Sequence, residues 1–335
     1  MSKITIKDIA KLVGVSTATV SNYLNGNLSR MSDKTQQRLQ EVIASTHYRP
    51  SNVAQQLAKN ETRIIGVSVV DITNPFTSTL LSGIYDTCGK AGYSVVFTNA
   101  NSDAYAELDN IHKLRQQDVA GLIIHPTDPD NPIFKILTND NVVFVDRQSA
   151  VPVIDTIVTD NFLAARAFVS DMSASGYEEL YFATWPIDNV STRRLRYQGF
   201  QAATGCKDDS HLLIVDPGQP SDTLTKQLAS IMQASRQKRT GFFTMNAKVL
   251  IHLLAILQNL GYSYPQDFGI GTYEDLDWMS ILHPGVSSIR QDSFQLGVTA
   301  VETLLEKLSR PKNTPLLREP RLLELPTIFM KRDSY

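Results

Sequence analysis

Residues 15–26 read VSTATVSNYLNG, a segment in which small polar side chains outnumber large apolar ones. Its hydroxyl and amide groups belong to Ser16, Thr17, Thr19, Ser21, Asn22 and Asn25. Such short side chains donate hydrogen bonds to phosphate oxygens or meet base edges while the backbone stays close to the polyanion. The pattern indicates contact with a nucleic acid, and the alternative is a weakly amphipathic surface helix.

Three short helices are expected around this segment, over residues 5–14, 16–26 and 32–46. Thr5 and Asp8 have the spacing of a capping box, and apolar residues then recur at helical intervals. A short, glycine-containing turn separates the first two helices. This arrangement predicts a helix-turn-helix, whose second helix lies in the major groove of DNA.

The charge of the chain is divided unevenly. Residues 1–63 contain nine Lys/Arg and four Asp/Glu, a balance of +5, whereas the remaining residues contain 23 bases and 30 acids, a balance of −7. A basic head on an acidic body is expected when one end of a protein meets a polyanion. A solvated surface with uneven charge is the alternative.

Two stretches resemble a known family. IKDIAKLVGVSTATVSNYLNG and the later YRPSNVAQQLA at 48–58 are similar to the N-terminus of the LacI/GalR (lactose-repressor) family of bacterial transcription regulators. The resemblance implies phosphate contacts by Thr5, Ser16, Thr19, Ser21 and Asn25. It implies base reading by Thr17, Ala18 and Asn22. Many members carry Arg at position 22, which reads guanine, whereas Asn22 suits adenine or reaches no base, and Ala18 offers only a methyl contact.

Residues 50–59 resemble the hinge helix of the same family. A helix of this length is unstable alone in water, so we expect it to order only with DNA and a dimer partner. The resemblance implies that Leu57 enters a central base step from the minor groove, with Asn52 and Ala54 nearby. Without the family, Leu57 would be interpreted as a core residue of a linker helix.

From residue 62 onward, apolar runs alternate with amphipathic segments, which predicts α/β lobes built on parallel sheets. The expected strands are 64–70, 93–100, 121–126, 142–146, 180–184, 212–216, 241–245 and 268–273. The expected helices begin near Phe76, Ala104 and Asn131 and cover 161–175, 193–204, 221–235 and 247–260. Two doubly wound lobes with ligand between them resemble the family's effector domain, which is similar to periplasmic sugar-binding proteins.

In that fold the chain crosses between the lobes three times, and we place the crossings near 161, 291 and 323. The expected domains are a DNA-binding head (1–49), a hinge and linker (50–61) and an effector-binding and dimerisation domain (62–335). In the last of these, the N-lobe comprises 62–161 and 292–322, and the C-lobe comprises 162–291 and 323–335.

Effector-binding candidates lie at strand ends. They match family positions at Phe76, Asp146, Arg147, Asp160, Ser191, Arg193, Arg196, Asn246 and Glu274. Aromatic faces stack on rings, while carboxylates, amides and guanidinium groups bind hydroxyls or anions. Each has another interpretation: Phe76 as core, Asp160 as a helix cap, Arg147 paired with a surface acid.

The departures from the family bear on the ligand. Ala247 follows Asn246 where an aspartate is usual, and Glu274 stands where a shorter carboxylate is usual. Arg147, Arg193, Arg194 and Arg196 together suit a negative ligand, so a sugar acid or sugar phosphate is preferred to a neutral hexose. Arg193 and Arg194 are adjacent on one helix and cannot both face the cleft.

Other classes of protein fit poorly. The sequence has no GxxxxGK[ST], GxGxxG or GxSxG motif and no metal-ligand spacing, so we expect no enzyme, cofactor site or metal site. Cys88 and Cys206 are expected to be small buried hydrophobic residues. The absence of a secretory signal and of long apolar runs predicts a cytoplasmic protein without membrane association. Because no leucine heptad tail is present, we expect a homodimer. It should bind a near-palindromic operator and repress carbohydrate genes, although activation stays open. The alternative is a sugar-binding protein without a transcriptional role.

Overall fold

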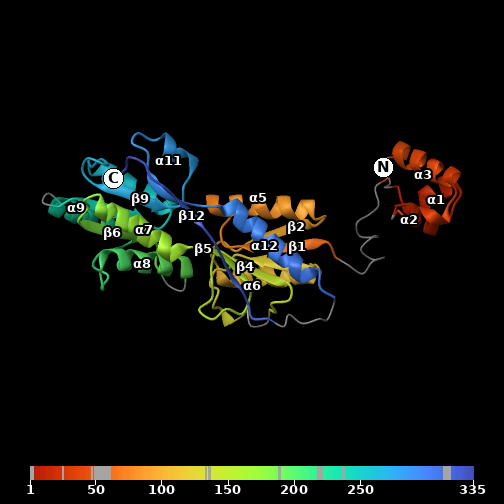
Figure 1. The fold of residues 1–335 in the computed structure, drawn as a ribbon, viewed down its shortest axis with the longest axis horizontal. Helices are drawn as coiled ribbons and strands as arrows, with labels where there is room; N and C mark the ends of the chain where they lie inside the picture. Colours follow the sequence, from red (N-terminus) through yellow and green to blue (C-terminus); the bar gives the residue numbers. More distant parts are fainter. Residues whose placement is uncertain are drawn as a thin grey trace. The chain divides into compact units, whose positions relative to one another are not determined.

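The computed structural model describes residues 4–335 except 25, 47, 49–61, 133, 135–136, 188–189, 217–221, 236–237 and 312–317. The chain divides into two compact units, Met1–Arg63 and Ile64–Tyr335 (Figure 1). None of the helices among the described residues is both long and apolar enough to cross a lipid bilayer.

The first unit is helical. Its elements are α1 (Ile6–Val13), α2 (Thr17–Leu24), η1 (Leu28–Arg30) and α3 (Asp33–Thr46). Ile9, Val20 and Leu39, one from each α-helix, are fully buried together. The capping box of Thr5 and Asp8 is present, so this prediction is confirmed.

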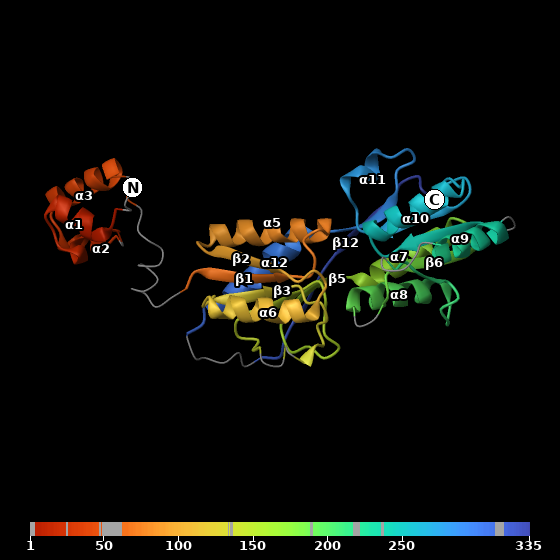
Figure 2. The ribbon, with the colours of Figure 1, turned by 180° about the vertical axis from the view of Figure 1, so that it is seen from behind.

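The second unit begins with a lobe built on a parallel sheet of order β11-β5-β4-β3-β1-β2. The strands are β1 (Ile64–Val69), β2 (Ser94–Asn99), β3 (Gly121–Ile124), β4 (Val142–Val145), β5 (Thr156–Thr159) and β11 (Leu322–Leu325). The helices are α5 (Pro75–Lys90), α6 (Ala104–Gln116) and α12 (Ser293–Leu308). Helices α5 and α12 pack on one face of the sheet and α6 on the other (Figure 2).

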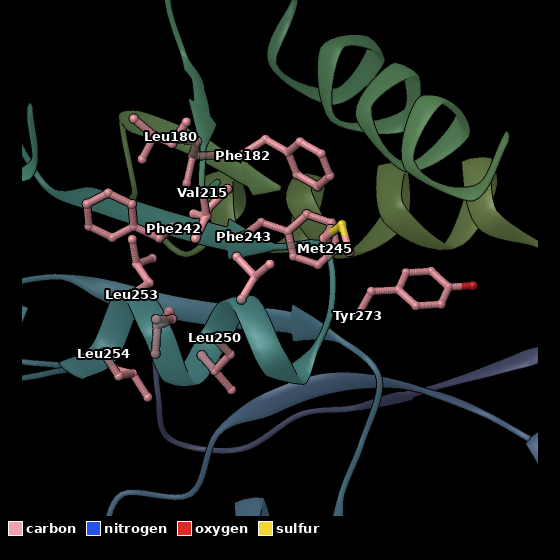
Figure 3. Close-up of a cluster of buried hydrophobic side chains, with 14 of the residues drawn as sticks. Leu180, Phe182, Val215, Phe242, Phe243, Met245, Leu250, Leu253, Leu254 and Tyr273 are labelled. Carbon is pink, nitrogen blue, oxygen red and sulfur yellow. The ribbon is translucent and has the colours of Figure 1, made fainter. Parts of the chain in front are cut away.

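The second lobe has the sheet order β12-β10-β9-β8-β6-β7. Its strands are β6 (Glu179–Thr184), β7 (Leu212–Ile214), β8 (Thr240–Thr244), β9 (Gly269–Tyr273), β10 (Ser287–Gln291) and β12 (Thr327–Met330). Its helices are α7 (Asn161–Ala174), α8 (Ser191–Thr204), α9 (Asp222–Ala234), α10 (Ala247–Asn259) and α11 (Asp277–Ile281). Figure 3 shows the apolar side chains that fill the space between β8 and α10.

Helices α5 and α12 approach each other very closely, and two glycines permit this. A Cβ on Gly83 would lie 2.2 Å from the carbonyl oxygen of Phe294, and a Cβ on Gly297 would lie 2.4 Å from that of Leu80. Any side chain at either position would force the helices apart. Helix α12 is therefore part of the N-lobe, although it lies far from α5 in the sequence.

The fold class is the one expected, two doubly wound lobes with a helical head, and two details differ. Strand β12 runs antiparallel to β10, so the second sheet is not wholly parallel. The chain crosses between lobes at Asp160, Asp292 and Pro326. The expected third crossing near 323 is wrong because residues 322–325 continue as β11, paired with β5 of the N-lobe. Strand β11 therefore belongs to the N-lobe.

Candidate functional site

The helix of the opening motif, α2, presents little apolar surface to the head. Val20 is its only fully buried side chain among those described, while Thr17 and Ala18 are exposed and Ser21 and Asn22 are half-buried. A helix held by so few core contacts leaves its other faces to solvent or a ligand. The short polar side chains on the exposed face of α2 are therefore available to a ligand.

The start of α2 is organised by a pair of hydroxyls. Ser16 Oγ accepts a hydrogen bond from the Thr19 amide at 3.1 Å and lies 2.9 Å from Thr19 Oγ1. One of the two hydroxyl hydrogens makes that mutual bond, so the other is left for an external acceptor such as a phosphate oxygen.

Thr5 differs in this respect. Its hydroxyl donates to Asp8 Oδ2 at 2.7 Å, and its amide donates to the same oxygen at 2.9 Å. Both of its donors are therefore used within the capping box, and a phosphate contact through either one competes with the cap. Asn25 and the hinge positions Asn52, Ala54 and Leu57 lie outside the described residues.

In the second unit, Arg196 is a buried C-lobe side chain that interacts electrostatically with Asp146 of the N-lobe. It lies on α8 and is 6% exposed. Its Nε donates to Asn161 Oδ1 at 2.8 Å, its Nη1 donates to the Met245 carbonyl at 2.7 Å, and its guanidinium stacks 3.5 Å from the centre of the Tyr273 ring. Among the described residues its Nη2 has no acceptor, which leaves one donor edge for a ligand.

Asp146 comes from the opposing N-lobe, directly after β4. Its Oδ2 lies 3.1 Å from Nε2 of His125, which follows β3. Burial alone would raise the pKa of Asp146, but His125, Arg196 and Arg147 outweigh it and hold that pKa below its usual value. Burial lowers the pKa of His125, so its ring is neutral.

Arg147 follows Asp146, but its guanidinium binds the backbone of the loop after β3. Nη1 donates to the carbonyl oxygens of Pro126 and Thr127 at 3.1 and 2.5 Å. The adjacent Glu107 carboxylate accepts from the Thr127 amide at 2.9 Å, and burial raises its pKa to about 7. Arg147 therefore contributes positive charge to the cleft wall, and it is not arranged as a surface ion pair.

Glu274 and Asn246 lie together at the start of α10. Asn246 Oδ1 accepts from the Val249 amide at 2.9 Å, and Glu274 Oε2 accepts from the Ala247 amide at 3.0 Å. Burial raises the pKa of Glu274 despite this bond. The alanine that departs from the family pattern thus supplies its backbone N–H to the longer carboxylate.

Asp146 and Glu274 share an unusual backbone. Their φ angles are +69° and +93°, in the left-handed region that side chains other than glycine rarely adopt. Such strain persists only where surrounding contacts enforce it, and it concentrates at ligand sites. Both carboxylates project from strained turns at the carboxyl ends of β4 and β9.

The remaining candidates have local roles. Asp160 Oδ1 accepts from the Leu163 amide at 2.9 Å as the cap of α7, which is the alternative considered from the sequence. Arg193 donates to the Pro186 carbonyl and lies over the Trp185 ring. Phe76 is buried on α5 and meets the His125 ring edge-on at 5.7 Å between centroids.

Among the described residues, side-chain hydrogen bonds at several positions join the lobes, including one between Thr159 Oγ1 of β5 and the Tyr273 hydroxyl of β9 at 3.2 Å. The Lys248 ammonium on α10 binds Asp71 Oδ2 at 3.0 Å and Thr73 Oγ1 at 2.9 Å. The Gln148 amide of the N-lobe donates to Ser191 Oγ of the C-lobe at 3.0 Å. Ser191 is thereby an inter-lobe contact at the start of α8.

A pocket of about 410 Å³ opens between the lobes on the side of the crossing segments. Phe76 and Phe294 line it from the N-lobe, and Glu274, Arg290 and Gln291 line it from the C-lobe. Among the described residues no group of His, Cys, Asp and Glu side chains is placed to hold a metal ion. The cleft therefore offers charge, amides and rings to an organic ligand.

Sequence reasoning missed three residues at this site: His125, Asn161 and Tyr273. Their only sequence signal is that each ends or follows an apolar strand, as the predicted candidates do. Five buried N-lobe atoms in this region have no hydrogen-bond partner among the described residues: Ser68 Oγ, Thr77 Oγ1, His125 Nδ1, Thr127 Oγ1 and Arg147 Nε. Unpaired buried groups of this kind are expected where a ligand or water binds.

Comparison with known proteins identifies the molecule. The model of the bacterial regulatory proteins of the lacI family matches residues 5–51, and a periplasmic binding protein domain model matches residues 65–314. The chain belongs to the lacI family of bacterial regulatory proteins. This LacI-family protein is thus a transcription regulator, and its family is not one of enzymes.

Relatives of this LacI-family regulator cover nearly its whole length. It is 31% identical to the HTH-type transcriptional regulator PtxS of Pseudomonas putida (91% of this chain, 90% of that protein). It is 29% identical to the HTH-type transcriptional regulator KdgR of Bacillus subtilis (93% of each). The Lac repressor dimer bound to operator and the anti-inducer ONPF has the same fold, with a TM-score of 0.84 and 24% identity over 99% of each chain.

Proposed function

We propose that this regulator is a cytoplasmic homodimeric repressor of carbohydrate-utilisation genes, controlled by a sugar acid bound between the lobes. LacI-family membership supports DNA binding, and two symmetric heads call for a near-palindromic operator. The observation that carries the ligand proposal is the buried Arg196, which has one donor edge left among the described residues.

Asp146 interacts electrostatically with both Arg147 and Arg196. Arg147 and Arg196 provide two positive charges, and Asp146 provides one negative charge. Glu107 and Glu274 have pKa values raised by burial, so both are poorer anions than an exposed glutamate. A ligand with one carboxylate balances this set better than a neutral hexose, and a sugar phosphate is the second choice.

The hydroxyl groups of a sugar acid fit the rest of the wall. Asp146 and Glu274 accept hydrogen bonds, while Ser68, Thr77 and the neutral His125 have unused polar atoms. The aromatic ring of Phe76 offers an apolar face beside them. A polyhydroxylated carboxylate satisfies both the charge and the unpaired groups.

In the head, we assign phosphate contacts to Ser16, Thr19 and Ser21, together with Thr5 and Asn25. We assign base reading to Thr17, Ala18 and Asn22, and minor-groove insertion to Leu57 with Asn52 and Ala54. The exposure of Thr17 and Ala18 on α2 supports the assignment of base contacts. The effector set is Phe76, Asp146, Arg147, Asp160, Ser191, Arg193, Arg196, Asn246 and Glu274, with Asp160 and Arg193 in supporting positions.

Exposed apolar side chains support the dimer. Tyr85 on α5 is 69% exposed and Ile281 on α11 is 72% exposed. Both views place α5 and α11 along the same side of the second unit (Figures 1 and 2). Large exposed apolar residues from both lobes on one side suit a partner subunit that contacts both lobes.

The test pairs each acid with its neutral counterpart. Melting temperature is measured with gluconate and galacturonate against glucose and galactose, and with glucose 6-phosphate. We expect the acids to raise the melting temperature and to change operator affinity in an anisotropy assay. Equal stabilisation by neutral sugars contradicts the acid proposal, and binding without any effect on operator affinity favours the solute-binding alternative.

A further inference from the structure

A second cluster of reactive side chains lies at the opposite end of the C-lobe sheet. Glu179 begins β6 and His211 precedes β7, so both lie at the amino ends of parallel strands, whereas the cleft is at their carboxyl ends. Cys206 joins them from the loop after α8. Helix α8 ends at Gly205, whose φ of +76° turns the chain toward the strand.

The three side chains form a relay. Cys206 Sγ lies 3.4 Å from His211 Nδ1, and His211 Nε2 lies 3.2 Å from Glu179 Oε2. Lys238 binds the other carboxylate oxygen at 2.6 Å. Hydrogen bonds from Lys238 and His211 lower the pKa of Glu179, so its carboxylate stays ionised. This is the order of a nucleophile, a base and a group that orients the base.

The hydrogen bonds of Ser210 and Glu179 determine which donor remains for His211 Nδ1. Ser210 Oγ lies 2.9 Å from His211 Nδ1, but its hydroxyl donates to Asp208 Oδ1 at 2.6 Å. Serine has one hydroxyl hydrogen, so it has none left for the imidazole. When Nε2–H donates to Glu179, Nδ1 is a bare acceptor, and the Cys206 S–H is the donor beside it. Ser210 can accept from Nδ1 once that nitrogen is protonated.

The loop that carries the thiol is fixed. Tyr197 donates from its hydroxyl to Asp209 Oδ1 at 2.7 Å, and the Cys206 amide donates to Thr204 Oγ1 at 3.3 Å. Cys206 itself is partly exposed, and the expectation that it is a buried hydrophobe is wrong. The thiol is therefore both positioned and accessible.

We propose that Cys206 is a modification site for low-molecular-weight disulfides, with His211 as its proton acceptor. The Cys206 thiol gives its proton to His211 Nδ1, and the thiolate attacks one sulfur of the disulfide. A new S–S bond forms to Cys206, the old S–S bond breaks, and the second sulfur leaves as a thiolate that takes up the proton. No other oxidant is required.

Cys88 provides an internal comparison, since the chain has two cysteines. It is fully buried on α5, and burial raises the pKa of its thiol to about 11. A fully buried, protonated thiol is inert toward disulfides in the folded protein. The folded chain is thus expected to contain one fast thiol and one that reacts only after unfolding.

The experiment follows release of the chromophoric thiolate from Ellman's reagent at about neutral pH. Peptide mass spectrometry assigns the fast site in the unmodified sequence, and oxidised glutathione serves as the second probe. In a Cys88→Ala background, His211→Gln is expected to slow labelling at least about tenfold, because general-base assistance is removed. Glu179→Gln is expected to give a smaller decrease, since it misorients the imidazole.

His112→Gln is the matched control, because it makes the same change at an exposed position on α6. Equal labelling of all variants in denaturant and unchanged melting temperatures show that folding is intact. The proposal is overturned if Cys88 reacts first, or if His211→Gln labels as fast as His112→Gln. A variant that fails to fold is replaced by His211→Asn, for which the same decrease is expected.

Discussion

Replacing Arg196 by Met tests the structural role of this side chain. Methionine keeps much of the apolar length of the side chain and removes the guanidinium. The change leaves Asn161 Oδ1 and the Met245 carbonyl without their 2.8 and 2.7 Å donors in a buried site. It also removes the stacking on Tyr273 and one of the charges that lower the pKa of Asp146.

The expected magnitude follows from these contacts. A hydrogen bond to a charged group contributes about 1.5–3 kcal/mol, and there are two of them. A desolvated cation–π contact adds about 2 kcal/mol, while retained packing and solvent reorganisation offset part of the sum. We expect a loss of about 3–5 kcal/mol in unfolding free energy, because two buried acceptors lose their charged donor.

Tryptophan fluorescence can be used to measure this loss of stability. The two tryptophans of the chain, Trp185 and Trp278, both pack against the C-lobe core, so urea unfolding followed by tryptophan fluorescence reports on that lobe. Arg166→Met, an exposed change on α7, is the control and should alter stability by less than about 0.5 kcal/mol. If Arg196→Met stays within that range too, the bonds to Asn161 and Met245 do not carry the energy assigned to them.

Three further predictions concern the two units separately. Asn22→Arg is expected to move base preference from adenine toward guanine, and a site selection that returns the same motif for both proteins would show that position 22 reads no base. Leu57→Ala is expected to weaken specific operator binding at least about tenfold with effector binding unchanged, and anisotropy titrations that give equal affinities would falsify the minor-groove role. Burial raises the pKa of Glu107 from 4.5 to about 7, so its stabilising contribution is complete below pH 4.5 and is lost as pH rises through 7. Glu107→Gln should remove this loss, about 3 kcal/mol, and a circular-dichroism melting profile with the same pH slope in both proteins would contradict the assignment.

Local signals in the sequence were sufficient for much of the fold. The capping box at Thr5 and the apolar runs of eight strands are fixed by neighbouring residues, so they could be predicted. Within the described part of the chain, four strands escaped prediction, β5, β10, β11 and β12, and each has only four or five residues. Two of them depend on their partners. Residues 322–325 alternate between exposed and half-buried, and they are a strand because β5 pairs with them. Residues 327–330 likewise form β12 only against β10.

The cleft was harder to predict because its geometry depends on rotation about single bonds. In the sequence TDN, Asp160 is the obvious polar candidate, yet its carboxylate caps α7 and the next residue, Asn161, turns inward to Arg196. No spacing rule distinguishes these two neighbours before the direction of the helix is known. His125 is similar, since its role arises from Asp146, which is 21 positions later and reaches it across adjacent strands.

The inter-lobe contacts of Lys248 and Gln148 bear on how a ligand can govern the regulator. The ion pair of Lys248 and Asp71 is about one-third exposed on each side, so it contributes no more than about 1 kcal/mol. The single bond from Gln148 to Ser191 is neutral and contributes about as much. A ligand that contacts Asp146 and Arg196 in one arrangement of the lobes can contribute about 3 kcal/mol of preference, or about 150-fold. A preference of this size exceeds the contribution of either contact taken singly, so a ligand bound at Asp146 and Arg196 would shift the population of lobe arrangements.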